Sequence, residues 1–349
     1  MTYNRIAKPR AYMDRLSFDL ANGFRTISNY TIIQDDGSTA VTFDGGQLED
    51  LFDMRPSNYA TIAHDTKAFY IIIDTGQTSD TVAEANFLAI LGHNFEEADA
   101  SFAVQHDDAS DFGSATFVSN SPTRVINAAV SSNANYVEPD NNGWSLITWA
   151  NNNTDNRYYR IIISKEGALG TNFDSDVKIG SIMLGEYIDF PHSPDLNLGF
   201  DIDYDGTNIV TSAGGSTFAN TSYLGSPVWS KTNPWILATS AVENIDSKSS
   251  RAYGRRKYNM NFSYVADDDL FQANMHAGHG AMIDGSDLYS QFFHKSLGSH
   301  LPFLLTIDKD NTSTPEGDYG LFRLADGGLK STQSAHRFWD TKLNLVEHW

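Results

Sequence analysis

The chain has 349 residues, of which 40% are hydrophobic and 12% aromatic, which is enough apolar material for two domains that each bury a core. With 24 basic against 44 acidic residues its net charge is −20, which argues against nucleic acid and anionic membranes as partners. The sequence contains no cysteine, so disulfides, thiol chemistry and cysteine metal sites are excluded.

The N-terminal segment, residues 1–40, predicts one or two strands. Residues 15–20 and 30–33 are rich in Leu, Ile, Phe and Tyr, as strands are. The first ten residues carry charge without an apolar run, so they do not look like a signal peptide. No window is apolar enough to span a membrane, and we expect no membrane insertion.

The middle of the chain reads as a series of short strands. Runs of Val, Ile, Phe and Tyr alternate with clusters of Gly, Asn, Asp and Ser, a pattern typical of β-sandwiches. An irregular loop over 48–63 precedes them. We predict the strands at 69–74, 87–92, 101–105, 115–118, 144–148, 157–164 and 177–184.

A domain boundary is predicted near residue 190, where two prolines close together interrupt the strand pattern. Beyond it, Tyr258, Met260, Phe262 and Tyr264 alternate along one face of a strand. Acidic residues from 267 indicate a helix start, and residues 286–297 have helical spacing before a capping glycine. Further strands are predicted at 199–205, 208–212, 301–307, 319–324 and 338–346.

Five motifs of the middle region occur in an ordered series: Tyr70–Gly76, Ala89–Asn94, Val104–Asp108, Arg157–Ile161 and Ile179–Gly185. In this order they resemble the discoidin or galactose-binding-like jelly roll, which we assign to residues 41–190. The predicted fold class is therefore mainly β: a jelly-roll sandwich plus a second β-rich domain with one or two short helices.

Residues 191–349 resemble tail proteins of long-tailed bacteriophages, of the distal-tail or minor-tail kind. The matching segments are Arg255–Phe262, Ala266–Asp269, Pro302–Asp308 and Phe338–Glu347. The termini of a jelly roll lie close together, so such a module is easily inserted into another domain. We therefore expect residues 1–40 to pair with the C-terminal domain while the sandwich faces outward.

Two groups of carboxylates are candidates for a structural calcium ion. Asp201, Asp203 and Asp205 precede Gly206 as in a calcium loop, but the twelfth position is Ser212 rather than Glu, so a polar hairpin turn is the alternative. The jelly-roll resemblance implies a second site built from Asp50 or Asp53 with Glu186, although no glycine follows either aspartate. No other cofactor is expected.

Aromatic residues near the Asn-rich loops are candidates for sugar binding, because sugar rings stack on aromatic faces while polar side chains bond the hydroxyls. We select Trp144, Trp149, Tyr136 and Phe112, together with Asp107 and Asp108. The alternative is that both tryptophans belong to the sandwich core. No catalytic residue is predicted, and the nucleophile-elbow, phosphate-loop and dinucleotide motifs are absent from the sequence.

These features together predict a structural virion protein of a bacteriophage tail, assembled in the host cytoplasm, rather than an enzyme. The resemblance implies a homo-oligomeric ring with other tail proteins as partners. The outward sandwich would contact either a cell-surface glycan or a neighbouring tail protein. A free carbohydrate-binding module is the alternative, followed by a glycoside hydrolase.

Overall fold

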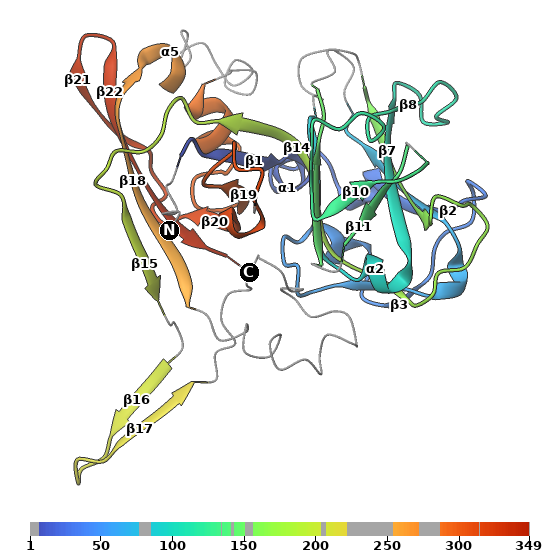
Figure 1. The fold of residues 1–349 in the computed structure, drawn as a ribbon, viewed down its shortest axis with the longest axis horizontal. Helices are drawn as coiled ribbons and strands as arrows, with labels where there is room; N and C mark the ends of the chain where they lie inside the picture. Colours follow the sequence, from blue (N-terminus) through green and yellow to red (C-terminus); the bar gives the residue numbers. More distant parts are fainter. Residues whose placement is uncertain are drawn as a thin grey trace.

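The computed structural model describes residues 7–76, 85–133, 135–140, 143–150, 156–203, 207–221, 254–271, 287–313 and 315–348. Strands make up most of the regular structure, and the predicted mainly β class is confirmed. Figure 1 shows a sandwich beside a second group of strands, with a two-stranded arm projecting from the latter. No helix in the described ranges is long and apolar enough to cross a membrane.

The sandwich consists of two antiparallel layers. The first layer has the order β14 (Val177–Asp189), β6 (Phe87–His93), β12 (Trp144–Thr148) and β9 (Arg124–Ile126), with β4 (Ala60–Ile62) on β14 and β3 (Phe43–Gly45) on β4. The second sheet has the order β10 (Ala128–Val130), β11 (Val137–Pro139), β7 (Ala100–Asp107), β13 (Tyr158–Lys165), β5 (Phe69–Asp74) and β2 (Tyr30–Gln34), with β8 (Thr116–Phe117) on β7.

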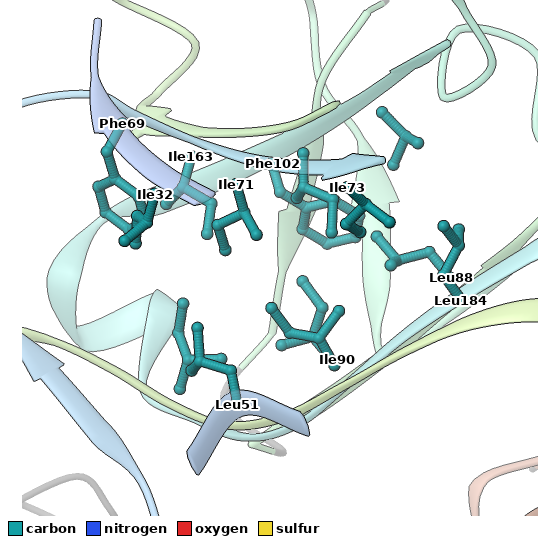
Figure 2. Close-up of a cluster of buried hydrophobic side chains, with 14 of the residues drawn as sticks. Ile32, Leu51, Phe69, Ile71, Ile73, Leu88, Ile90, Phe102, Ile163 and Leu184 are labelled. Atoms are coloured by element: carbon teal, nitrogen blue, oxygen red, sulfur yellow. The ribbon is translucent and has the colours of Figure 1, made fainter. Parts of the chain in front are cut away.

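The sandwich core forms because alternate residues of each strand point between the layers. Phe69, Ile71 and Ile73 of β5 are fully buried there, while the residues between them are only partly buried. Figure 2 shows these side chains meeting Leu88 and Ile90 of β6. All seven residues of β6 are buried, because the other face of the first layer is covered as well.

The C-terminal strands cover this second face of β6, because Leu304, Tyr319 and Leu321 pack in one apolar cluster with its residues Phe87, Ala89 and Leu91. Strand β1 (Arg10–Asp14) pairs with β14 on one side and with β19 (Phe303–Thr306) on the other. The same sheet continues through β20 (Tyr319–Leu324), β22 (Phe338–Glu347), β18 (Arg255–Ala266) and β15 (Gly199–Asp203), and β21 (Lys330–Ala335) pairs with β22. One continuous sheet therefore connects the sandwich with the C-terminal part.

The N-terminal segment contributes to both parts. β1 pairs with C-terminal β19, whereas β2 is the edge strand next to β5 in the second sandwich sheet. The division of the chain at residues 40 and 190 stays a prediction.

Residues 15–20, expected as a strand, form helix α1 (Arg15–Ala21) instead. The Asp14 side chain accepts hydrogen bonds from the backbone amides of Leu16 and Ser17 and so caps a helix start.

The remaining elements are short. They are η1 (Ile27–Asn29), η2 (Leu48–Phe52), η3 (His64–Thr66), α2 (Phe95–Ala98), α5 (Asp267–Leu270), the π-helix η4 (Tyr289–His294) and η5 (Pro315–Asp318). η4 occupies the region predicted as a helix over 286–297. The arm is a hairpin of β16 (Thr207–Thr211) and β17 (Thr217–Thr221), and it extends away from the rest of the chain (Figure 1).

Candidate ligand-binding face

The two tryptophans expected to present exposed rings are buried: the exposed fraction is 0% for Trp144 and 2% for Trp149. The ring centroid of Trp144 in β12 lies 5.3 Å from that of Tyr319 in β20, within the apolar cluster between the first layer and the C-terminal strands. Trp149 packs in the sandwich core. The expectation of exposed faces is therefore wrong for both residues, and the core alternative is correct.

The other predicted ligand residues lie around the outer face of the second sheet. In the antiparallel register Arg160 of β13 is opposite Gln105 of β7 and Ile72 of β5. Ile162 is opposite Ala103 and Tyr70 in the same way. Directly opposed residues share one face of a sheet, so these side chains form one surface. We call it the Arg160 face, defined by Tyr70, Ile72, Gln105, Phe112, Tyr158, Arg160 and Ile162.

Arg160 is held between two aromatic rings. Its Cζ lies 4.8 Å from the ring centroid of Tyr70 and 4.3 Å from that of Phe112, distances at which a cation is attracted to a ring face. Its Nε donates to Gln105 Oε1 at 2.8 Å, and Nη2 donates to the same oxygen. Arg160 forms no ion pair with the residues described in the structure, and the Asp107 carboxylate acts on its charge only from beyond ion-pair distance.

Burial lowers the pKa of Arg160, but a guanidinium remains charged at neutral pH. The half-buried cation therefore presents fixed hydrogen-bond donors on an otherwise apolar and aromatic surface. Tyr136 and Ile162 are almost fully buried beside it, with Tyr70 and Phe117 packed against them. Tyr136 thus packs against Ala103 and Ile162 on this side of the sheet and does not present the exposed ring that was expected.

Phe112 reaches Arg160 because the loop between β7 and β8 folds back over the sheet. Its φ of 53° is left-handed, which a bulky residue rarely adopts. The loop is stabilised by Asp107, whose Oδ1 accepts from the Ala109 amide at 3.2 Å and whose Oδ2 accepts from the Ser114 amide at 3.0 Å. The left-handed backbone at Phe112 is thus held by a loop in which Asp107 and Asp111 both accept backbone hydrogen bonds.

Asp107 therefore has a structural role in place of the ligand contact predicted for it. It is buried, and although burial raises its pKa, the hydrogen bonds from Ala109 and Ser114 leave that pKa below the ordinary value. Asp108 is exposed at the start of the loop. Of the predicted ligand residues, Phe112 is the one in direct contact with Arg160.

A second arginine borders the face. Arg157 donates from Nε and Nη2 to the two carboxylate oxygens of Asp74, at 2.8 and 2.9 Å, which lowers the pKa of Asp74. Its Cζ lies 4.9 Å from the ring centroid of Tyr158, and the Tyr158 ring in turn meets Phe112 edge-on at 6.5 Å. This pair is neutralised, whereas Arg160 is not.

Sequence reasoning missed Arg160, Tyr70 and Gln105. A signal was present, because the alternation of β13 places Tyr158, Arg160 and Ile162 on the face opposite the core residues Tyr159, Ile161 and Ile163. The contribution of Gln105 and Tyr70 depends on the pairing register, and no local pattern specifies that register.

The predicted metal ligands are not assembled into a common site. Asp50 and Asp53 do lie together, because the Asn58 side-chain amide donates to both, at 3.0 and 2.8 Å. Glu186 instead accepts from Lys295 Nζ at 2.6 Å. The ranges described by the structure contain no group of three or more potential acidic, His or Cys metal ligands.

The second predicted metal site lies on β15. Asp203 there forms an ion pair of 2.6 Å with Lys257, which lowers the pKa of Asp203. Asp201 is an exposed residue of the same strand, and Asp205 lies outside the described residues. Strand β15 pairs with β18, and the next strand, β16, pairs with β17, so these two successive strands do not pair with each other and the polar hairpin alternative is not confirmed.

No protein-family model and no curated protein sequence matches the chain. Among solved structures, it is similar to chitosan-binding module 1 of a chitosanase/glucanase from Paenibacillus sp. IK-5, with a TM-score of 0.29 and 14% identity over 45% of this chain and 93% of that one. A GH29 fucosidase of Ruminococcus gnavus in complex with fucose gives a TM-score of 0.28 and 12% identity over 42% of this chain and 25% of that one.

A family 89 glycoside hydrolase from Clostridium perfringens gives a TM-score of 0.24 and 19% identity, over 45% of this chain and 14% of that one. This chain spans a quarter or less of the two hydrolases. Similarity at these scores says nothing about a shared function.

Proposed function

We propose that this chain is a non-catalytic structural protein whose sandwich binds carbohydrate on the Arg160 face. One observation supports this most strongly: a charged guanidinium lies between the rings of Tyr70 and Phe112 without an ion pair among the described residues. Its donors suit sugar hydroxyl oxygens, and the neighbouring Tyr70, Tyr158 and Ile72 provide partly exposed apolar surface for the C–H face of a sugar ring.

The test is a substitution of Arg160 by Gln, which keeps a polar side chain of similar reach but removes the charge. After a glycan array has identified a ligand, titration calorimetry should give about tenfold weaker binding or worse for R160Q, since a hydrogen bond from a charged donor contributes ~1.5–3 kcal/mol.

The matched control is Arg337→Gln, because Arg337 lies beside Asp268 far from the sandwich and should leave the affinity unchanged. Equal affinity of R160Q and the wild type for that glycan, or an array without any bound glycan, would rule out the Arg160 face as a carbohydrate site.

A second observation favours assembly. β15 and β21 lie on opposite sides of the β18–β22 pair and have no further strand beside them in the described structure. Phe200 and Ile202 of β15 and Ile209, Val210 and Phe218 of the arm are about half exposed or more. Edge strands with exposed apolar side chains are prone to pair with another chain.

We therefore propose that copies of the chain join head to tail through the β15 flank and the arm, and that a closed ring results. With the tail-protein resemblance of residues 191–349, this supports a bacteriophage tail component that is assembled in the host cytoplasm. Other tail proteins are its further partners, and the sandwich is its outward module.

Light scattering after gel filtration checks the assembly. We expect the wild type to have the molar mass of an oligomer, and the double substitution of Phe200 and Ile202 by Ser to lower it. Leu169→Ser, at an exposed sandwich position, is the control and should keep the oligomer. A wild-type monomer at high protein concentration would contradict the ring and favour a free carbohydrate-binding module.

A further inference from the structure

A pocket of about 220 Å³ lies in the C-terminal part, where β22 changes its neighbour. β22 pairs with β21 up to Lys342 and with β20 from Leu345 onward. The turn of residues 325–329 leaves the sheet between these two pairings, just after the Ala325 amide donates to the Asn344 carbonyl oxygen at 2.8 Å. The pocket is lined by Phe293, Leu324, Asp326, Gly328, Leu329, Lys330, Lys342, Leu343 and Asn344.

Two lysines lie opposite each other at this pocket. Lys330 and Lys342 are direct cross-strand partners, so they share one face of the sheet with Cβ atoms roughly 4.5–5.5 Å apart. Neither forms an ion pair with a residue that the structure describes. Like charges in this position disfavour folding, in a chain that otherwise has an excess of 20 acidic groups. An anion between the two ammonium groups would relieve the repulsion.

The pocket also requires a hydrogen-bond donor. Asn344 Nδ2 donates to Asp326 Oδ2 at 2.7 Å, which fixes the orientation of the amide. Asn344 Oδ1 is buried and accepts no hydrogen bond from the described residues. A buried acceptor without a donor is unfavourable, and a hydroxyl group of a ligand would satisfy it.

The rest of the lining is apolar. Phe293, Leu329, Leu324 and Leu343 close it from the core face of the sheet, while Lys330 and Lys342 lie on the outer face. The two lysines and Asp326 leave a net charge of +1. At about 220 Å³ the pocket is smaller than the 300–1,000 Å³ typical of sites for drug-sized ligands. The occupant must therefore be small, negatively charged and able to donate from hydroxyls.

We propose that this pocket binds an acidic monosaccharide, a sugar ring that carries a carboxylate. The carboxylate accepts from Lys330 and Lys342 and a ring hydroxyl donates to Asn344 Oδ1, all on the outer face of the sheet. Leu343 and Phe293 close the pocket from the core face. This site is separate from the Arg160 face and does not depend on it, so either can fail while the other stands.

Titration calorimetry with D-glucuronate, D-glucose and acetate tests the site on the full chain. We expect glucuronate to bind at least about tenfold more tightly than either of the others, because only glucuronate supplies both the charge and the hydroxyls. An oligosaccharide ending in glucuronic acid shows whether the ligand is the free sugar or the end of a glycan. If it binds as tightly as the monosaccharide, the pocket accepts a chain end. If it does not bind, the pocket takes only the free sugar. Equal binding of glucose or acetate, or no binding of glucuronate, would overturn the proposal.

Lysine substitutions distinguish a binding site from a structural one. Lys342→Gln and Lys330→Gln should each weaken glucuronate binding by about tenfold or more, while the melting temperature without ligand stays equal or rises, because the repulsion is gone. Lys67→Gln, at an exposed sandwich position, is the charge control and should change neither quantity. Unchanged glucuronate affinity in both pocket variants, or lower melting temperatures in both, would show that the lysines are structural.

Discussion

At the scale of single residues, His93 is a polar side chain that the fold buries completely. It is the last residue of β6. Its ring stacks on Phe95 with a centroid distance of 4.5 Å, and its Nε2 lies 3.0 Å from Ser145 Oγ. Burial lowers the pKa of His93 to about 3, so the ring is neutral at physiological pH.

The buried His93 ring predicts a pH dependence of stability. The unfolded chain binds a proton near the ordinary pKa of 6.5, while the folded chain resists protonation down to about 3. The contribution of the neutral ring is therefore complete above pH 6.5 and decreases as pH falls. At 1.36 kcal/mol per unit the loss is at most about 5 kcal/mol over this window.

Urea unfolding of the wild type and of His93→Gln between pH 7 and pH 4 measures this contribution. The variant should be less stable at pH 7, but its free energy of unfolding should decrease less steeply toward pH 4. Parallel curves for the two proteins would mean that His93 does not contribute to acid sensitivity.

At the scale of elements, the alternation of apolar residues predicted most sandwich strands. It did not predict which residues are buried by segments that lie far away in the sequence. β5, β13 and β14 lie where their β-branched runs predict them. Trp144 was misjudged because its partner Tyr319 is 175 positions away, and no local pattern reports such a contact. The α1 helix was missed because its cap, Asp14, belongs to the preceding strand.

The penultimate residue of strand β6 is a glycine whose conformation and packing both matter. Gly92 has φ of 70°, and a Cβ added there would lie 2.3 Å from the Pro56 carbonyl oxygen. We expect Gly92→Ala to destabilise the protein by more than the ~1–2 kcal/mol that left-handed backbone alone costs an alanine.

Gly37→Ala isolates the backbone effect, because Gly37 has φ of 74° with no atom within 4 Å of the added Cβ. Chemical unfolding should give a small loss for this variant and a larger one for Gly92→Ala. Equal losses would mean that the Pro56 backbone moves aside freely.

At the scale of the whole molecule, the class of fold was predictable from the sequence and the proposed binding surfaces were not. Composition and strand spacing identified a mainly β chain, yet the Arg160 face depends on the register of three strands and on a folded-back loop. The Lys330–Lys342 pocket likewise arises where one strand exchanges neighbours. Such features are set by pairing between distant segments, for which a single sequence has no direct signal.

The position of β1 has a mechanical consequence. Because β1 is hydrogen-bonded to β14 on one side and to β19 on the other, a force that pulls the sandwich along β1 loads two ladders in shear. Hydrogen bonds loaded in shear must break together, whereas a flexible tether would simply extend. The connection through β1 should therefore transmit a pulling force from the sandwich to the C-terminal strands with little extension.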